Sequence, residues 1–394
     1  PERHGRWVHW AKVEPENHRI ATSTHYPKLG AYDSHDPAVI DQHIKWAKES
    51  GIDAFICTWW GKGTFDDRAF ELILKRASKA KFSATVYWET VPGRGEKKIK
   101  RAVSDLLYIL KKYSSHPAFF SLNGKPVIFV YGRVMGQVDL AQWEPILTEV
   151  KKKHTKDFIL IADGWRQEFA QIFDGIHTYN ICGWVKGKNP QELRLFSRKR
   201  FSRAVSLARR WKKISCLTVI PGYDDTKIRK PGLRADRQNG ETYRVLWEEA
   251  IRADPDWVLI TSWNEWHEGS EIEPSWEYGD KYLKLTKIYA PRFKKKPPFK
   301  AKQKESSSFL SPDLLEVAQE FKDIRIGILP QVENVLPIYL SQAGFNIVEI
   351  KWEEIAEGSK LSARNFPLII YAGYESYRRS VKSEGDVERG LLSY

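Results

Sequence analysis

Cysteine is scarce in this sequence of 394 residues, and its scarcity argues against two classes of protein. The three cysteines, Cys57, Cys182 and Cys216, lie far apart, each within an apolar run. An odd number at such spacing favours neither a disulfide framework nor a zinc site, so we interpret them as small core residues. No His-Glu-x-x-His or clustered-Asp pattern is present either, and we expect neither a metal nor another cofactor.

The sequence also lacks an apolar run of about eighteen residues, the length that crosses a membrane, so we expect no membrane segment. It begins at Pro1 without an initiator Met, and no signal-peptide core follows. We therefore expect that the chain is cut from a longer one and that its native targeting segment is not included. A bacterial periplasmic or secreted location is the preferred hypothesis, and the sequence has no feature that predicts an oligomeric state.

Acidic residues are outnumbered, since 64 Lys and Arg against 50 Asp and Glu give a net charge of +14. Such an excess raises the question of nucleic-acid binding. The basic residues are spread over expected helix surfaces, however, and no zinc-finger, RNP or helix-turn-helix pattern accompanies them. We expect no nucleic-acid partner. Sixteen Trp and seventeen Tyr are abundant by contrast, and clefts that bind carbohydrate are one use of such an excess.

Short apolar runs alternate with amphipathic stretches of helix length between residues 36 and 290, which predicts a parallel sheet covered by helices. Nearly every strand candidate ends in polar or aromatic residues. This favours a (β/α)8 TIM barrel, which collects its active site from many strands, over a doubly wound sheet with a single crevice. The candidates are Ile52–Trp60, Ser83–Glu89, Pro126–Tyr131, Phe158–Ala162, Gly175–Tyr179, Leu217–Pro221 and Trp257–Ser262.

Seven strands are one fewer than such a barrel needs. Residues 1–35 are loop-like and rich in Trp, so we expect the first strand to precede Pro1; residues 19–26 are a weaker alternative because that run is polar. The predicted fold class is thus an α/β TIM barrel that lacks its first strand here and is followed by part of a second, open α/β domain.

The domain boundaries follow from composition. We assign residues 1–290 to the barrel and residues 291–319, rich in Pro, Lys and Ser, to a linker. Residues 320–394 are predicted to be a truncated α/β domain of flavodoxin-like or amidotransferase-like type. Gly373 and Tyr374 follow its third strand and are a hint of a site there.

The most informative segment begins as a strand, Trp257–Ile260, and continues as Ser-Trp-Asn-Glu-Trp-His-Glu-Gly at positions 262–269. Carboxylates and aromatic rings at the carboxyl end of a strand are typical of sugar-cleaving sites, because the acids move protons and the rings stack on pyranose faces. Glu265 and Glu268 are three residues apart, so one helical turn would direct both into one cleft. The alternative is that both are solvated surface acids, but strand ends of this composition rarely serve packing alone.

This segment resembles glycoside hydrolase family 99, the endo-α-mannosidases and endo-α-mannanases, together with family-99-like bacterial relatives. The resemblance covers residues 3–290 and implies an α-glycosidase that acts with retention but without a covalent glycosyl-enzyme. By position, Glu265 would take the proton of the substrate's 2-hydroxyl, which attacks C1 and forms a 1,2-anhydro sugar. Glu268 would be the general acid and then the general base. The matching segments, in order, are Gly5–Trp10, Gly51–Asp53, Trp59–Gly61, Tyr87–Thr90, Phe173–Tyr179, Pro221–Thr226 and Ser262–Gly269.

Other residues at the ends of the strands are candidates for binding an oligosaccharide or polysaccharide. We expect the aromatic ones to line one concave surface around the two acids and Glu268 to be the more desolvated or more closely paired acid. For His267 a structural role, and for Asp224 a position facing solvent, is nearly as well supported by the sequence as substrate binding. His177 is expected to lie inside the barrel with its hydrogen bonds satisfied. The candidates are Trp59, Trp60, Trp88, Glu89, Tyr131, Tyr179, Tyr223, Asp224, Arg229, Asn264, Trp266 and His267.

The sequence departs from the family in loops that line the substrate. Glu89-Thr90-Val91 stands where Glu-Pro-Tyr is usual, Trp263 stands where Phe is common, and residues 180–184 do not match. These differences put mannose specificity in doubt but remove neither acid. Two other functions therefore stay open: a sugar transferase of polysaccharide biosynthesis, and a carbohydrate-binding pseudoenzyme. Retention of both acids argues against the pseudoenzyme, and the absence of a Gly-rich phosphate-binding turn argues against the transferase.

Overall fold

The computed structural model describes residues 10–295, 317–329, 340–341, 343–357, 361–370, 380–381 and 385–386. The chain divides into two compact units, Pro1–Pro297 and Pro298–Tyr394. The last helix of the first unit, α10 (Lys281–Lys294), continues past residue 290, where the sequence placed the end of the barrel. Most of the expected linker lies outside the described residues.

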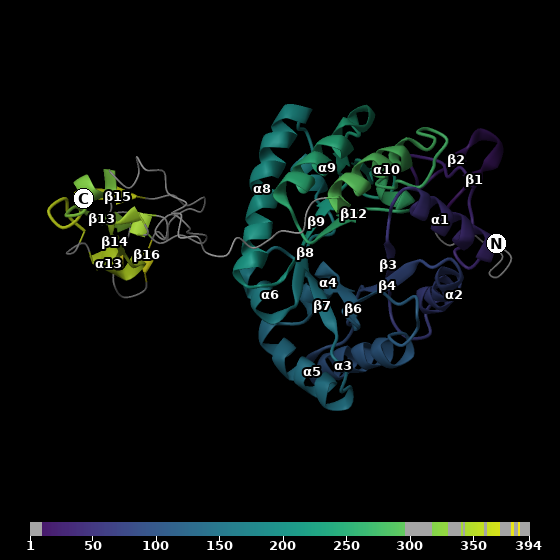
Figure 1. Ribbon diagram of the computed structural model, residues 1–394, viewed down its shortest axis with the longest axis horizontal. Helices are drawn as coiled ribbons and strands as arrows, with labels where there is room; N and C mark the ends of the chain where they lie inside the picture. The colour runs from purple at the N-terminus through teal and green to yellow at the C-terminus, as the bar shows by residue number, and fades with distance from the viewer. Residues whose placement is uncertain are drawn as a thin grey trace. The chain divides into compact units, whose positions relative to one another are not determined.

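A parallel sheet curls through the first unit and confirms the predicted fold class (Figure 1). Each strand pairs in parallel with the next, for example Trp59 with Trp88 and Trp257 with Cys216. The short strand β5 (Ser121–Leu122) pairs antiparallel with β6 (Lys125–Val130) and is not part of the parallel strand order. The strand order is β12 (Trp257–Ile260), β9 (Ile214–Val219), β8 (Gly175–His177), β7 (Ile159–Asp163), β6 (Lys125–Val130), β4 (Ser83–Trp88) and β3 (Ala54–Trp59).

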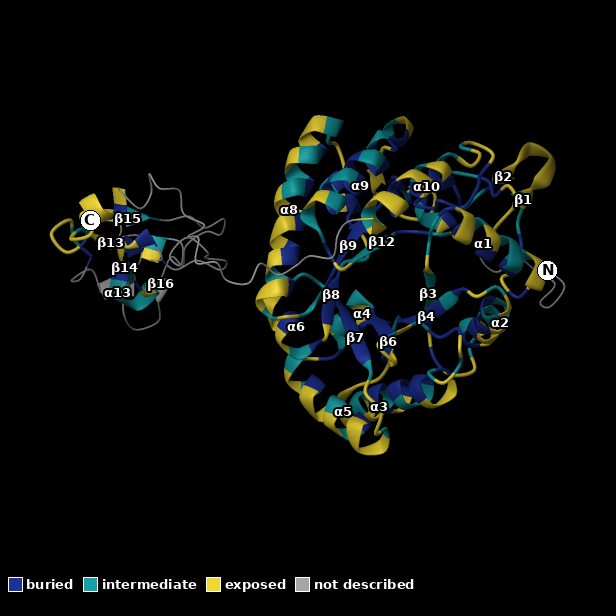
Figure 2. Cartoon of the chain, viewed as in Figure 1, coloured by how far each residue is buried: buried dark blue, intermediate teal, exposed yellow. Residues whose placement is uncertain are grey.

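Helices surround these strands, each with one buried face toward the sheet and one exposed face (Figures 1 and 2). The long helices agree with the amphipathic stretches of the sequence, and side chains cap the first turns of some of them. Thr64 accepts a hydrogen bond from the Asp67 amide, and Asn189 forms a capping box with Glu192. The long helices are α1 (Pro37–Glu49), α2 (Phe65–Lys79), α3 (Gly95–Lys112), α5 (Leu140–Lys153), α8 (Pro190–Arg210) and α9 (Glu241–Ala253).

Three short helices were not predicted from the sequence. They are α4 (Gly132–Gln137), α6 (Gln167–Ile172) and α7 (Cys182–Val185), which lie in the connections that follow β6, β7 and β8. None of the described helices is both long and apolar enough to cross a membrane.

The end strands β3 and β12 have no strand between them among the described residues. The alternative first strand, residues 19–26, is wrong: β2 (Arg19–Ile20) pairs antiparallel with β1 (Val13–Glu14) in a separate two-stranded sheet. The polar character of this run explains the outcome, because a barrel strand must fill an apolar interior. A first strand upstream of Pro1 remains a prediction.

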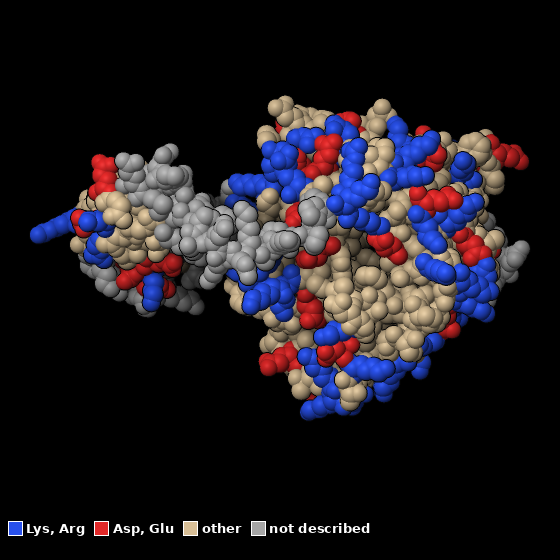
Figure 3. All heavy atoms as spheres, viewed as in Figure 1, with Lys and Arg blue, Asp and Glu red and all other residues tan. Residues whose placement is uncertain are grey.

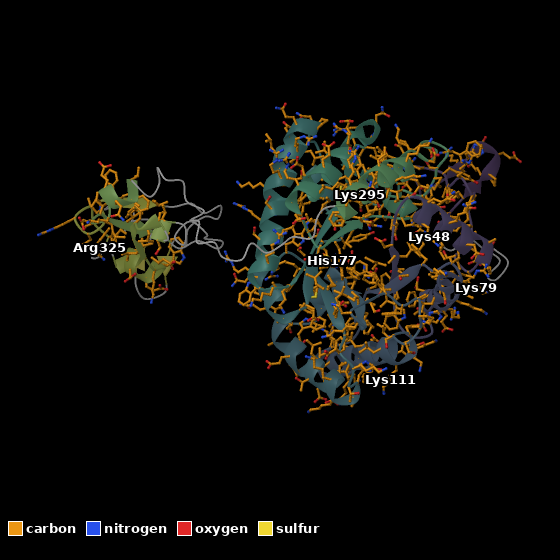
Figure 4. All side chains as sticks on the ribbon, in the orientation of Figure 1. Lys48, Lys79, Lys111, His177, Lys295 and Arg325 are labelled. Atoms are coloured by element: carbon orange, nitrogen blue, oxygen red, sulfur yellow. The ribbon has the colours of Figure 1, made fainter. Side chains whose placement is uncertain are left out.

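Alternation along the strands separates two cores, because successive side chains of a strand point to opposite faces. Side chains such as Trp59, Val86 and Trp88 pack against the helices. Side chains such as Tyr87 and Phe129 fill the barrel interior. His177 lies at the centre of the unit among these strands, buried at 2% exposure (Figure 4).

The second unit contains a three-stranded parallel sheet with β13 (Arg325–Ile328) between β14 (Asn346–Glu349) and β15 (Leu368–Ile370). These strands agree with the apolar runs of the sequence at residues 324–329, 346–350 and 368–371, from which strands are expected. The other described elements are α13 (Trp352–Glu357) and the antiparallel pair β16 (Ser380–Val381) and β17 (Gly385–Asp386). Gly373 and Tyr374 lie outside the described residues, so the hint of a site there stays untested, as does the proposed type of this domain.

Candidate active site

The loop after β12 carries both acids. Its geometry is set locally: the Glu265 amide donates to Ser262 Oγ at 2.9 Å, and residues Trp266–Glu268 form one turn of 3-10 helix. Gly269 ends the turn at φ +57°, and a Cβ there would lie 2.9 Å from Thr24 Oγ1 and 3.0 Å from the Asp224 backbone. Glycine is therefore required for the turn that brings the loop back.

Glu265 lies at a point open to solvent but surrounded by protein. Burial, and then the charges of Glu268 and Glu89, raise its pKa from 4.5 to about 7. The residue nevertheless presents an exposed surface. Protein therefore surrounds the carboxylate while water still reaches it and screens its interactions.

Glu268 is the more closely paired acid, with its side chain 14% exposed. One carboxylate oxygen accepts a hydrogen bond from Tyr179 at 3.3 Å, and the other lies 3.2 Å from both terminal nitrogens of Arg229. Glu268 thus has one phenol and one guanidinium as its partners.

Arg229 is held from behind by Tyr223 and Asp225. Its guanidinium donates to Tyr223 Oη at 2.8 Å and to Asp225 Oδ2 at 2.5 Å, and Tyr223 also donates to Asp225 at 3.0 Å. Tyr223 is 3% exposed and so cannot serve as the sugar platform that the sequence suggested. Its role in the structure is to orient the arginine that contacts Glu268.

Glu89 is the third carboxylate of the site. It follows β4 and accepts a hydrogen bond from Thr58 Oγ1 at 2.7 Å. Burial raises its pKa to about 7, against the opposing effects of the Thr58 bond and of Arg133. Glu265 and Glu89 influence each other electrostatically, as do Glu268 and Glu89, so the three acids lie in one region at the carboxyl ends of the strands.

Trp60 and Tyr131 lie on the same side of the barrel as these acids. Trp60 is 41% exposed, and the Arg133 guanidinium lies 4.6 Å from its ring centroid and 5.6 Å from that of Tyr131. Tyr131 packs edge-on against Tyr179, with ring centroids 5.6 Å apart. An exposed indole beside phenol rings is a surface on which a sugar face can stack.

Three other tryptophans were predicted to line the cleft, and the structure shows that they are buried instead. Trp59 and Trp88 are fully buried toward the helices, where Trp59 Nε1 donates to Asp67 at 2.7 Å and Trp88 packs edge-on against Trp143. The reason is parity: Tyr87 points into the barrel, so its neighbour Trp88 must point out. Trp266 is 2% exposed and its indole faces inward under the loop.

The remaining candidates lie at the margin of the site. Asn264 is exposed and donates through its amide to Tyr32 Oη at 3.0 Å. The His267 ring lies 6.4 Å from that of Trp10. Asp224 accepts hydrogen bonds from the amide and hydroxyl of Thr226, at 3.1 and 2.6 Å, so its carboxylate is used to shape its own loop.

The sequence analysis did not single out several residues of the site. Asp163 ends β7 and accepts hydrogen bonds from Tyr87 Oη at 3.2 Å, from the Tyr179 amide at 3.1 Å and from the Gly132 amide at 3.0 Å. Its position as a polar residue at a strand end was the available signal. Arg133 follows the end of β6 and carried the same signal, whereas no local pattern pointed to a role for the buried Tyr32.

Two further features concern ligands. Among the described residues no group of His, Cys, Asp or Glu has the arrangement of a metal site. A cavity of about 300 Å³ is lined by Lys125, His154, Asp157 and Phe158 at the amino ends of β6 and β7. It lies at the opposite end of these strands from the three acids and is therefore not part of their site.

Lys and Arg are spread among Asp and Glu over the face shown in Figure 3.

A curled parallel sheet inside a ring of helices, with paired carboxylates and an exposed indole at the carboxyl ends of the strands, defines the class of the TIM-barrel glycoside hydrolases. The comparison with known sequences agrees: the sequence model of glycosyl hydrolase family 99 matches residues 2–287. The chain belongs to this family.

Similar proteins include the glycoprotein endo-alpha-1,2-mannosidase of Mus musculus, 27% identical over 312 residues that cover 69% of this chain and 65% of the relative. The chain thus spans just under two thirds of that relative. The glycoprotein endo-alpha-1,2-mannosidase-like protein of Homo sapiens is 27% identical over 346 residues, 74% of this chain and 73% of the relative. The solved endo-alpha-mannosidase of Bacteroides thetaiotaomicron has a TM-score of 0.63 at 26% identity, covering 75% of this chain and 94% of that one.

Proposed function

We propose that this protein is a glycoside hydrolase that cleaves an α-linked glycan of the α-mannoside type with retention of configuration. The observation that carries the proposal is the cluster of Glu265, Glu268 and Glu89, which are close enough to interact electrostatically. The exposed indole of Trp60 lies on the same side of the barrel. The α-mannoside specificity is supported by relatives named endo-alpha-1,2-mannosidases.

In the first step, the Glu265 carboxylate takes the proton of the substrate's 2-hydroxyl. The 2-oxygen attacks C1 as the C1–O bond to the leaving group breaks, and Glu268 gives its proton to the leaving oxygen. A pKa of about 7 suits Glu265 to this role, since a base works best when its pKa is near the working pH.

In the second step, the Glu268 carboxylate takes a proton from water, and the water oxygen attacks C1 and opens the 1,2-anhydro ring. Glu265 then returns its proton to the 2-oxygen. Arg229 and Tyr179 contact Glu268 in the form that exists between the two steps, because both donate hydrogen bonds and so stabilise the carboxylate. Two inversions at C1 give overall retention.

The proposal is tested by incubating the protein with α-linked manno-oligosaccharides and following the first product by proton NMR. We expect the α-anomer of the new reducing end to form before mutarotation. First formation of the β-anomer would contradict retention. Transfer to an added sugar without hydrolysis would favour the transferase alternative, and binding without cleavage would favour the pseudoenzyme.

A further inference from the structure

Tyr32 contacts both chain neighbours of Glu265 from a segment 232 residues before Asn264. Its hydroxyl accepts hydrogen bonds from Asn264 Nδ2 at 3.0 Å and from Trp266 Nε1 at 3.3 Å, and it donates to Glu273 Oε2 at 2.7 Å. A phenol hydroxyl has one proton and two lone pairs, so all of its hydrogen-bonding capacity is used here.

Glu273 supports this arrangement from below. Its side chain is fully buried; Oε2 also accepts from Trp266 Nε1 at 3.1 Å, and Oε1 lies 3.0 Å from His43 Nε2 on α1. Tyr32, Trp266 and His43 thus direct three hydrogen-bonding groups at one buried carboxylate and fix its position. Burial and the Glu273 charge in turn raise the pKa of Tyr32, so its hydroxyl keeps its proton.

Glu265, by contrast, has no hydrogen-bond or ion-pair partner for its carboxylate within the part of the chain that the structure describes. Its main chain is held, by Ser262 Oγ and by the amides of Glu268 and Ser270 that donate to its carbonyl at 3.2 and 3.4 Å. The direction of its side chain therefore depends on how its own loop is held. Tyr32 forms hydrogen bonds with the residues immediately before and after Glu265 in that loop.

We propose that Tyr32 is a positioning residue that sets the orientation of Glu265 through Asn264 and Trp266, with Glu273 and His43 as its support. The catalytic consequence rests on the proposed function, in which Glu265 acts as the base. The structural part, that the Tyr32 hydroxyl holds the loop, stands independently of it.

The test compares Tyr32→Phe with Tyr243→Phe as a matched control. Tyr243 is also buried, and its hydroxyl forms a hydrogen bond with Thr286 Oγ1 at 2.9 Å, between α9 and α10. Both variants remove one buried hydroxyl, but only the first should change the loop. For Tyr32→Phe we expect kcat to fall by about 10- to 100-fold, since a displacement of about 1 Å can cost ~10² in rate. Tyr243→Phe should stay within about twofold.

Two readouts separate positioning from a general loss of folded protein. Burial raises the pKa of Glu265 most, and the charges of Glu268, Glu89 and Arg229 also act on it. If the loop is released into water in Tyr32→Phe, this pKa should fall, and the acid midpoint of kcat/KM should move to lower pH. A smaller folded fraction would leave that midpoint in place. Backbone hydrogen exchange of residues 261–273 should be faster in Tyr32→Phe and unchanged in Tyr243→Phe.

The inference is overturned if Tyr32→Phe keeps the natural kcat, or if exchange in this loop does not change. Absence of hydrolysis by the natural protein would count against the proposed function, while the exchange comparison would still decide whether Tyr32 holds the loop. If Tyr32→Phe does not fold, His43→Asn tests the same chain of contacts one step further away. It should change kcat and loop exchange in the same direction by a smaller factor, and no change in either would refute the role of the network.

Discussion

The Glu265→Gln variant should be more stable than the natural protein near pH 8 and about equal to it near pH 5. The reason is that folding raises the pKa of Glu265 from 4.5 to about 7. The folded state therefore binds this proton more tightly than the unfolded chain does, and its stability falls as the pH rises from about 4.5 through about 7. Glutamine has the same shape without the charge and avoids that loss.

The size of the effect follows from the same values. The difference between 4.5 and about 7 would correspond to roughly 3 kcal/mol for a fully enclosed group. Glu265 is open to water on one side, which screens its interactions, so we expect about 1–2 kcal/mol. For a unit of this size that is a rise in Tm of roughly 2–3 °C.

Thermal unfolding followed by calorimetry at the two pH values measures the difference. Glu96→Gln is the control, because the Glu96 side chain is 83% exposed and its contact with Lys100 is a surface pair of little energetic value. Equal Tm values for Glu265→Gln and the natural protein at the higher pH, or a lower Tm for the variant, would refute the reasoning. A gain of the same size at both pH values would show that the charge is not its cause.

Three other results are expected. Since the proposed base must be ionised, kcat/KM should fall about tenfold for each pH unit below about pH 7, and a pH-independent value down to about pH 5 would remove Glu265 from that role. Trp60→Ala should raise KM about fivefold through loss of ~1 kcal/mol of sugar stacking. Trp88→Ala should lower the free energy of unfolding by about 3–5 kcal/mol and leave KM unchanged, and the reverse pattern would contradict the placement of the two residues. Arg237 lies 2.6 Å from Glu271, both nearly fully buried, so Arg237→Met should destabilise the protein by about 3–5 kcal/mol in chemical denaturation. A loss under ~1 kcal/mol would argue against that estimate.

The fold was largely predictable because it depends on repeated local patterns. Each barrel strand is a short apolar run between amphipathic stretches, and periodicity alone distinguishes them. The short helices α4, α6 and α7 could not be predicted in this way, because four to six residues are too few to show a helical period.

The site was predictable only in part. Glu265 and Glu268 are neighbours in sequence, so one turn brings them together, and their strand end could be recognised. Trp59 and Trp88 were assigned to the cleft because the sequence shows that a strand ends but not which of its last side chains points inward. Fixing that parity requires the pairing register, in which Trp59 lies opposite Trp88 and both face the helices.

The support beneath the loop could not be predicted at all. Tyr32 and His43 lie in the first tenth or so of the chain, whereas Glu273 follows the turn that carries the two acids. Hydrogen bonds across 230 or more residues leave no local pattern. Such contacts depend on which loops the curled sheet brings together. They are therefore found only once the three-dimensional structure is known.

The measurement that tests the central claim most directly uses two activated aryl α-mannosides that differ only in whether C2 carries a hydroxyl or a hydrogen. The account predicts that the natural protein releases the aryl group from the first and not from the second. It also predicts that Glu268→Gln still releases it from the first, whereas Glu265→Gln is inactive on both. Rapid hydrolysis of the 2-deoxy compound, or a sugar ester trapped on either glutamate, would contradict the 2-hydroxyl route and point to an ordinary carboxylate nucleophile.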